Sequence, residues 1–308
     1  MIIFQNPDNY NLSDSMVTVG VFDGVHRGHL SVLESLKTIA KQKFLKSLLV
    51  TFSEHPKHLL QSNEDFKLLT TNEEKLNLIR KTGIDALVYI PFNRDISNLN
   101  YSDFIKNILI KKFKAKTVLM GYDNHFGKDG DGSFINVSVQ SSDLGIEVIQ
   151  LNELNSDNHI SSSKIRKTLL KGDIKTATDL LGYNYGFDSI VVEGNKLGRK
   201  MGFPTANLLI SCPQKIMPNF GVYAVKVFFD NQYYNGILNY GLKPTVNNDF
   251  TKQPLAETHI FNFSNDLYGK LLRVEFVDKI RDEKKFTSID ELKSQIVIDI
   301  KEAEKILV

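Results

Sequence analysis

Apolar positions in the first half of the chain alternate between short continuous runs and stretches with helical spacing. Continuous runs bounded by polar residues predict buried strands, and they cover residues 16–21, 47–52, 85–90, 117–120 and 147–151. Helical spacing predicts helices from residue 29 onward, over 71–83, over 102–113 and over 161–172. Thr71 and Glu74 predict a capping box at the start of the second of these helices. Strands that alternate with helices predict a parallel sheet, which binds ligands at the carboxyl ends of its strands.

The pattern changes after about Gly182, where short β-rich runs are separated by turn residues, including Asp230 and Asn231. These runs cover residues 189–193, 221–229, 233–238, 257–263 and 271–277, and they predict a small antiparallel barrel. Ser288 begins a capping box for a final helix. We therefore expect two domains, 1–183 and 184–308, joined by a short linker between Gly182 and Asp188.

Composition adds limits to this picture. The 308 residues suffice for two domains with separate cores, and a formal net charge of +2 gives no broad basic surface for nucleic acid. Cys212 is the only cysteine, which excludes an internal disulfide. No apolar run is long enough to cross a bilayer, and the first residues lack the pattern of a signal peptide. We expect a cytoplasmic enzyme without membrane or nucleic-acid partners.

The segment GVFDGVHRGHL, residues 20–30, places two histidines in a glycine-rich turn between a strand and a helix. Gly24 and Gly28 allow close approach of the backbone to a ligand, and a helix N-terminus favours an anion. His26 and His29 add hydrogen-bond donors for phosphate oxygens. The alternative is that the histidines only cap and pack the turn.

A second phosphate-type segment, ISSSKIR, covers residues 160–166. Ser161 is a good N-cap, and hydroxyl groups, Lys164 and Arg166 gather at the start of the predicted helix. The two segments together favour a nucleotide site over simple helix capping.

The second half carries GNKLGRKMGFPTANL, residues 194–208. Its glycines and basic residues predict a flexible cationic loop, and Thr205 and Asn207 offer two hard oxygen ligands. This combination suits magnesium and ATP, whereas a simple glycine-rich hairpin is the alternative.

Residues 20–30 followed by 160–166 resemble the nucleotidyltransferase module of bacterial FAD synthetases. The second half resembles bacterial riboflavin kinase along nearly its whole length. The segments that carry this likeness are GRKMGFPTANL and residues 218–224, 239–245, 257–263 and 266–269. Together the halves resemble the bifunctional riboflavin kinase/FAD synthetase family over about residues 15 to 300.

The resemblance implies an α/β nucleotidyltransferase-type N-terminal domain with a Rossmann-like parallel sheet, and a small antiparallel β-barrel kinase domain with a C-terminal helix. Riboflavin, FMN and ATP are the implied small-molecule partners, FAD the product and Mg²⁺ the cofactor. Glu257 is the implied general base of riboflavin phosphorylation, and His26 and His29 are implied to stabilise charge during FMN adenylylation. Implied ATP contacts come from Gly20, Phe22, Asp23, Gly28, Ser162, Ser163, Arg166, Gly194, Lys196, Gly198 and Arg199, flavin contacts from Asp123 and Phe126, and metal contacts from Thr205 and Asn207.

Several of these residues have simpler alternatives. Asp23 can be a turn-forming side chain, and Glu257 a solvated charge at a strand start. The chain also departs from the family pattern at Ser53 and Glu54, and Asn124 replaces an aromatic residue.

Two other functions stay open from the sequence. Similar histidine pairs occur in cytidylyltransferases and pantetheine-phosphate adenylyltransferases, so the first half can belong to another nucleotidyl transfer. The chain can also be a flavin-binding regulator with degraded sites, although a mere binder has no use for a base together with a phosphate clamp.

Overall fold

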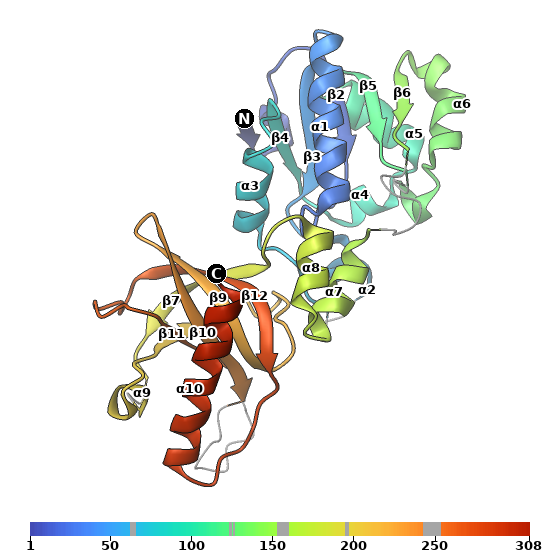
Figure 1. Cartoon of the computed structure of the whole chain (residues 1–308). Helices are drawn as coiled ribbons and strands as arrows, with labels where there is room; N and C mark the ends of the chain where they lie inside the picture. Colours follow the sequence, from blue (N-terminus) through green and yellow to red (C-terminus); the bar gives the residue numbers. More distant parts are fainter. Residues whose placement is uncertain (62–65, 123–124, 126, 153–159, 195–196, 243–253) are drawn as a thin grey trace. The chain divides into compact units, whose positions relative to one another are not determined.

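The computed structural model describes residues 1–61, 66–122, 125, 127–152, 160–194, 197–242 and 254–308. The chain divides into two compact units, Met1–Ser162 and Ser163–Val308 (Figure 1). This division by packing lies before the predicted boundary at 183/184, which concerns independent folding and stays a prediction.

The first unit is built on a parallel sheet with the strand order β1-β4-β3-β2-β5-β6. The strands are β1 (Ile2–Phe4), β2 (Ser15–Val19), β3 (Lys46–Phe52), β4 (Ala86–Ile90), β5 (Ala115–Met120) and β6 (Glu147–Gln150). The sheet confirms the predicted α/β class. The chain passes from β2 outward to β3 and β4 and then returns to β5, so β2 and β5 flank the point where the strand order reverses.

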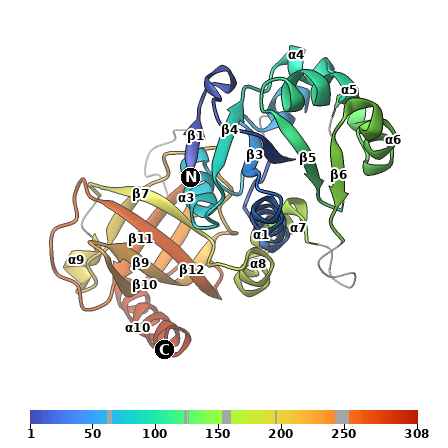
Figure 2. The same cartoon turned by 90° about the horizontal axis from the view of Figure 1, so that it is seen from above.

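Helices cover both faces of this sheet, as Figure 2 shows from above. The helices of this unit are α1 (Arg27–Gln42), α2 (Pro56–Gln61), α3 (Asn72–Arg80), α4 (Arg94–Asn98), α5 (Tyr101–Asp103), the π-helix Phe104–Ile110 and α6 (Phe134–Leu144), with 3₁₀ turns at Pro7–Asn9 and Lys128–Gly130. One core cluster joins Leu33 and Leu36 of α1 to the sheet, and another joins Phe104 and Leu109 of the π-helix to it. Alternate strand residues supply the two clusters, which explains the continuous apolar runs.

The second unit contains a closed barrel with the order β10-β11-β8-β7-β12-β9, in which every pairing is antiparallel. Its strands are β7 (Gly186–Val192), β8 (Ala206–Leu209), β9 (Gly221–Phe229), β10 (Gln232–Leu242), β11 (Pro254–Ile260) and β12 (Leu271–Arg281). The helices are α7 (Ser162–Leu170), which begins at the last residue of the first unit, α8 (Ile174–Leu181), α9 (Leu197–Met201) and α10 (Ile289–Ile306).

The barrel, the final helix and the hairpin turn between β9 and β10 confirm the sequence prediction. Asp230 and Asn231 both have positive φ angles, 50° and 59°, as a two-residue hairpin turn requires. The outer face of the barrel packs on α10 through Val222, Ile237 and Ala303.

Some local features differ from the prediction. Residues 197–201 form the short helix α9 where we expected only a loop, and β7 begins at Gly186, earlier than expected. Ser288 caps α10, but the Glu291 carboxylate bonds to Thr287 rather than closing the box on Ser288.

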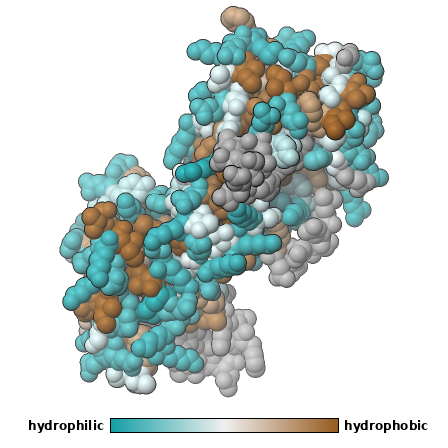
Figure 3. Space-filling model, turned by 45° about the vertical axis from the view of Figure 1, so that its right-hand side comes forward, coloured by the Kyte–Doolittle hydropathy of each residue, from teal (hydrophilic) through white to brown (hydrophobic). Residues whose placement is uncertain are grey.

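No helix in the described part of the chain is long and apolar enough to cross a membrane. The face shown in Figure 3 is largely hydrophilic, with hydrophobic residues in separate patches.

Candidate functional site

The glycine-rich turn lies at the carboxyl end of β2, beside the point where the strand order reverses. Ligands of open parallel sheets bind at such points. The backbone of the turn has unusual conformations, because Phe22 and Val25 have φ angles of 53° and 34°. Positive φ is costly for a β-branched residue, and such strain is concentrated at functional sites.

Asp23 holds this turn in place. Its buried carboxylate accepts hydrogen bonds from the backbone N–H groups of Leu69 and Thr70 at 3.0 to 3.1 Å, and from the Thr70 hydroxyl at 3.1 Å. The N–H of Gly24 donates to the same hydroxyl, and a Cβ at position 24 would lie 2.6 Å from Leu69. These hydrogen bonds are those of a turn-forming side chain, and a direct contact of Asp23 with ATP stays a prediction.

His26 and His29 stand side by side at the start of α1. His26 is the N-cap, since its Nδ1 accepts the backbone N–H of His29 at 3.3 Å. The imidazole rings stack with centroids 3.6 Å apart, and the centroid of the Phe22 ring lies 4.6 Å from that of His29. Gly20 precedes the turn and Gly28 lies in the first helical turn of α1.

Burial lowers the pKa of His29 well below its ordinary value, and the nearby His26 and Lys75 lower it further. Its buried Nδ1 has no hydrogen-bond partner in the described part of the chain. A neutral imidazole with unused hydrogen-bonding capacity is therefore held in the turn.

The first residue of α7 contacts this turn, because the Ser162 hydroxyl donates to the backbone oxygen of Asp23 at 2.9 Å. Ser163 and Arg166 follow on α7 in the second unit. Asp123 and Phe126, expected after β5, lie outside the described residues. The structure thus brings together Asp23, His26, His29 and Ser162.

A row of polar residues crosses the barrel. Glu257 on β11 is directly opposite Asn207 on β8 and opposite Asn239 on β10. Side chains opposite one another in antiparallel strands lie on the same face. Thr205 is two residues from Asn207, just before β8, so the potential metal ligands and the potential base lie near one another.

Two glycines allow the preceding loop to pack on these ligands. A Cβ at Gly194 would lie 2.0 Å from the Asn207 amide nitrogen, and one at Gly198 would lie 2.4 Å from the backbone oxygen of Phe203 and 3.0 Å from the Thr205 hydroxyl. Lys196 lies outside the described residues.

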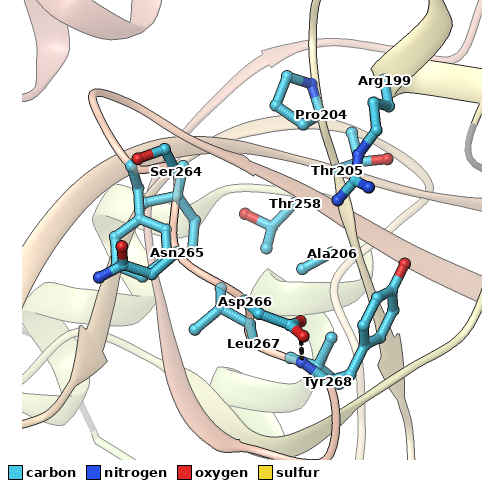
Figure 4. Close-up of a pocket in the computed structure, with 13 residues that line it drawn as sticks. Arg199, Pro204, Thr205, Ala206, Thr258, Ser264, Asn265, Asp266, Leu267 and Tyr268 are labelled. Atoms are coloured by element: carbon cyan, nitrogen blue, oxygen red, sulfur yellow. Dashed lines mark hydrogen bonds between the residues drawn. The ribbon is translucent and has the colours of Figure 1, made fainter.

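Two cavities flank the row, and Thr205 lines both. The first, of about 420 Å³, is drawn in Figure 4, where Arg199, Thr205 and the Asp266 carboxylate surround it and that carboxylate accepts the Tyr268 N–H at 3.0 Å. The second, of about 350 Å³, is lined by polar and charged residues, among them Glu257, Asn239 and Lys284, and by apolar residues. Those apolar residues are Leu197, Met201, Phe203, Val222, Ile237, Phe286, Leu292 and Ile296. Thr258 lines the first cavity and Glu257 the second, as the alternation of side chains along β11 dictates.

The second cavity is closed on one side by an ion pair between β12 and α10. Two guanidinium nitrogens of Arg281 bond to the Asp299 carboxylate at 2.7 to 3.1 Å, and Gln295 donates to the same carboxylate at 2.9 Å. Asp299 is 2% exposed. This network fixes the helix against the strand at the cavity wall.

Family comparisons agree with this division of sites. The family model described as FAD synthetase matches residues 8–165, and the one described as riboflavin kinase matches residues 181–307. A bifunctional riboflavin kinase/FMN adenylyltransferase of Buchnera aphidicola is 39% identical over 95% of this chain and 94% of its own length. The enzyme of the same name from Bacillus subtilis is 38% identical over 94% of this chain and 91% of its own. The chain belongs to the bifunctional riboflavin kinase/FMN adenylyltransferase family.

A solved structure supports the fold assignment. A Streptococcus pneumoniae protein matches with a TM-score of 0.89 and 30% identity, covering 98% of each chain. That protein is described as a macrolide-efflux protein, but the two family models and the sequence relatives group this chain with the flavin enzymes.

Sequence reasoning missed several residues that the structure places in these sites. Asn239 continues the row beside Glu257, Arg281 and Asp299 close a cavity wall, and Lys75 is buried near His29. Lys75 follows acidic residues at a helix start, a pattern typical of an exposed helix face. The strand pattern would have allowed Asn239 to be found, but only with the register of β10 and β11 known.

Proposed function

We propose that the chain phosphorylates riboflavin to FMN with ATP, and then adenylylates FMN with a second ATP to give FAD and pyrophosphate. The placement of Asn207 opposite Glu257, with Thr205 lining two adjacent cavities, carries the kinase assignment. The family membership supports both activities.

In the kinase unit, the cavity at Arg199 and Asp266 takes ATP, and the cavity beneath α10, with its large apolar side chains, takes the flavin ring. Thr205 lines both cavities, so the γ-phosphate and the ribityl hydroxyl meet near it. Glu257 lies on the flavin side, where its carboxylate accepts the proton as the hydroxyl attacks phosphorus. This transfer depends on positioning and charge neutralisation more than on covalent help from the protein.

Thr205 and Asn207 fit a Mg²⁺ ion shared with the phosphates of ATP. Both offer oxygen ligands close in the sequence, and the missing Cβ atoms of Gly194 and Gly198 leave the backbone packed against them. Mg²⁺ keeps several waters and needs few protein ligands. When bound, the ion neutralises phosphate charge.

In the first unit, His26 and His29 stabilise charge as the FMN phosphate attacks the α-phosphate of ATP and pyrophosphate leaves. Ser162, Ser163 and Arg166 hold the outer phosphates, and Gly20, Phe22, Asp23 and Gly28 shape the turn around them. The buried Nδ1 of His29, which has no hydrogen-bond partner among the described residues, supports this role. No covalent enzyme intermediate is required. ATP as co-substrate of both steps favours a cytoplasmic location.

The test is incubation of the protein with riboflavin, ATP and Mg²⁺, followed by chromatographic separation of the flavins. We expect FMN and FAD to form in succession. Glu257→Gln keeps the shape of the side chain but removes the proton acceptor, so FMN formation should fall by about 10² or more with little change in riboflavin binding. FAD formation from supplied FMN should continue.

His29→Ala should give the reverse pattern, with FAD formation reduced about 10²- to 10³-fold and riboflavin phosphorylation unchanged. A comparable loss of both activities in either variant would refute the assignment of two separate sites. Normal phosphorylation by Glu257→Gln would show that the base lies elsewhere.

A further inference from the structure

Lys75 is a buried lysine beneath the glycine-rich turn that the proposed chemistry leaves without a role. It lies on α3 and is 5% exposed. Its ammonium donates to the backbone oxygen of Phe52 at 3.3 Å and lies 5.6 Å from the centre of the Tyr89 ring. Phe52 is the last residue of β3, so the ammonium is at the carboxyl end of the sheet, where the nucleotide turn also lies.

The ammonium retains hydrogen-bonding capacity. It has three N–H donors, and Phe52 provides its one hydrogen-bond acceptor within the described residues, at a long distance. Asp23 attracts the ammonium, but its carboxylate already accepts hydrogen bonds from Leu69 and Thr70. A buried cation with unused donors is costly unless a ligand completes it.

A second group with unused capacity lies nearby. The ammonium is close enough to His29 to lower the pKa of that imidazole, and the Nδ1 of His29 is buried without a partner among the described residues. The charged and titratable groups around Lys75 are thus Asp23 on the turn, His29 on α1 and Tyr89 on β4. Two of the groups around the turn, the ammonium of Lys75 and the imidazole of His29, have capacity to spare for an anion.

We propose that Lys75 is a phosphate-binding residue of the adenylyl transfer site, and that its ammonium donates to a phosphate oxygen of a nucleotide bound at the turn. ATP and FMN both carry this chemistry, as does the product pyrophosphate. The inference rests on the proposed binding of ATP at residues 20–30.

The test compares Lys75→Met with Lys75→Arg in the full-length enzyme, with Lys81→Met as the matched control. Lys81 is the C-cap residue of the same helix and is exposed. We expect Lys75→Met to weaken the binding of ATP, pyrophosphate or FMN about 10- to 100-fold, as loss of a charged hydrogen bond does. Lys75→Arg should recover part of the loss, and Lys81→Met should behave as wild type.

Separate KM values identify the source of the phosphate. A rise in the KM for ATP together with weaker pyrophosphate binding assigns Lys75 to the triphosphate, whereas a rise in the KM for FMN alone assigns it to the attacking phosphate. Unchanged binding of all three by a folded Lys75→Met protein overturns the proposal. An equal loss in Lys75→Met and Lys75→Arg, accompanied by a fall in Tm, overturns it too, because it indicates a packing role.

A measurement on the wild-type enzyme avoids dependence on one variant. Burial lowers the pKa of Lys75 to about 8, and a bound anion would raise it again. The measurement is made at a pH of about 8.5, close to the pKa of the amine. Pyrophosphate binding should then take up more protons in the wild-type enzyme than in Lys75→Arg, as calorimetry in two buffers measures. Equal proton uptake would refute direct binding.

Riboflavin phosphorylation should be normal in all these variants. His29→Ala separates the proposal from its premise: if that variant forms FAD normally, the assigned ATP site itself is wrong. If His29→Ala fails and Lys75→Met binds normally, only the role of Lys75 is wrong.

Discussion

At the scale of single residues, the burial of Lys75 affects stability as well as chemistry. Desolvation lowers its pKa from the ordinary value of 10.5 to about 8 in the folded state. Below about pH 8 Lys75 is protonated in both the folded and the unfolded chain. The folded state then bears the full free-energy cost of burying the charged amine, on the order of 3 kcal/mol. Between the two pKa values the unfolded chain binds more protons, so stability rises with pH through this window.

We therefore expect Lys75→Met to be more stable than wild type at pH 7. This difference in stability should shrink toward pH 10, because an unperturbed lysine titrates at about 10.4. Urea denaturation of the full-length proteins, followed through the unfolding of the first unit at both pH values, measures this difference in stability. Lys81→Met, in which an exposed amine is lost, should show no such trend. A difference in stability between Lys75→Met and wild type that stays constant across the pH range would contradict the burial argument.

Gly194 allows a second prediction at this scale. Because a Cβ there would overlap the amide of Asn207, Gly194→Ala should displace that amide and weaken the binding of Mg²⁺ and ATP to the kinase site. Asn207→Ala should do the same, and higher Mg²⁺ concentrations should restore part of its activity. If Gly194 acts through Asn207, the double variant should be little worse than Asn207→Ala, as kinase assays over a range of Mg²⁺ concentrations would reveal. Fully additive losses would indicate a separate effect of the alanine.

At the scale of elements, the pair of Arg281 and Asp299 joins β12 to α10. Arg281→Met leaves a nearly buried carboxylate without its charged partner, which should destabilise the second unit by about 3–5 kcal/mol. The double variant Arg281→Met/Asp299→Leu should recover much of that loss, because no charge then remains buried. Thermal unfolding and riboflavin titration measure both effects. Lys305→Met, which breaks an exposed pair with Glu302 on α10, should leave the Tm unchanged.

The elements also show what sequence can and cannot predict. The capping box of Thr71 and Glu74 and the turn at Asp230 and Asn231 were predicted because local chemistry determines them. The π-helix at Phe104–Ile110 was predicted only as helix, since apolar spacing does not distinguish i→i+5 from i→i+4 hydrogen bonds.

The site shows the same distinction. His26 and His29 stand in one short segment, so their spacing in the sequence was enough to predict that they lie close together. The row of Asn207, Glu257 and Asn239 needed the pairing of distant strands, and resemblance to the family was the only source for Glu257. The burial of Lys75 depends on the packing of α3, which residues 71–75 alone do not reveal.

At the scale of the whole molecule, the two boundaries predict different fragments. Residues 184–308 contain the complete barrel and should phosphorylate riboflavin. Residues 163–308 add α7, which buries Ile165 and Leu169, and α8, which buries Ile174, Ala177 and Leu181. Lys175 of α8 also pairs with Asp278 at 2.8 Å.

We expect the longer fragment to be more stable, with a Tm higher by several degrees, and to phosphorylate riboflavin at the same rate. Differential scanning calorimetry and a kinase assay compare the two. An insoluble shorter fragment beside an active longer one would place the working boundary after Ser162.

The barrel has no free edge, since each strand is paired on both sides. A strand at an open edge can absorb an inserted residue by sliding, but in a closed ring a slip in one pair forces a compensating slip in the others. One residue inserted within β11 would turn Glu257 from the outer face to the interior while Asn207 stayed in place. Ring closure thus protects the register of the proposed kinase site: a chain with the wrong register cannot complete the barrel, so a completed barrel already has Glu257, the proposed base, aligned with Asn207, a proposed metal ligand.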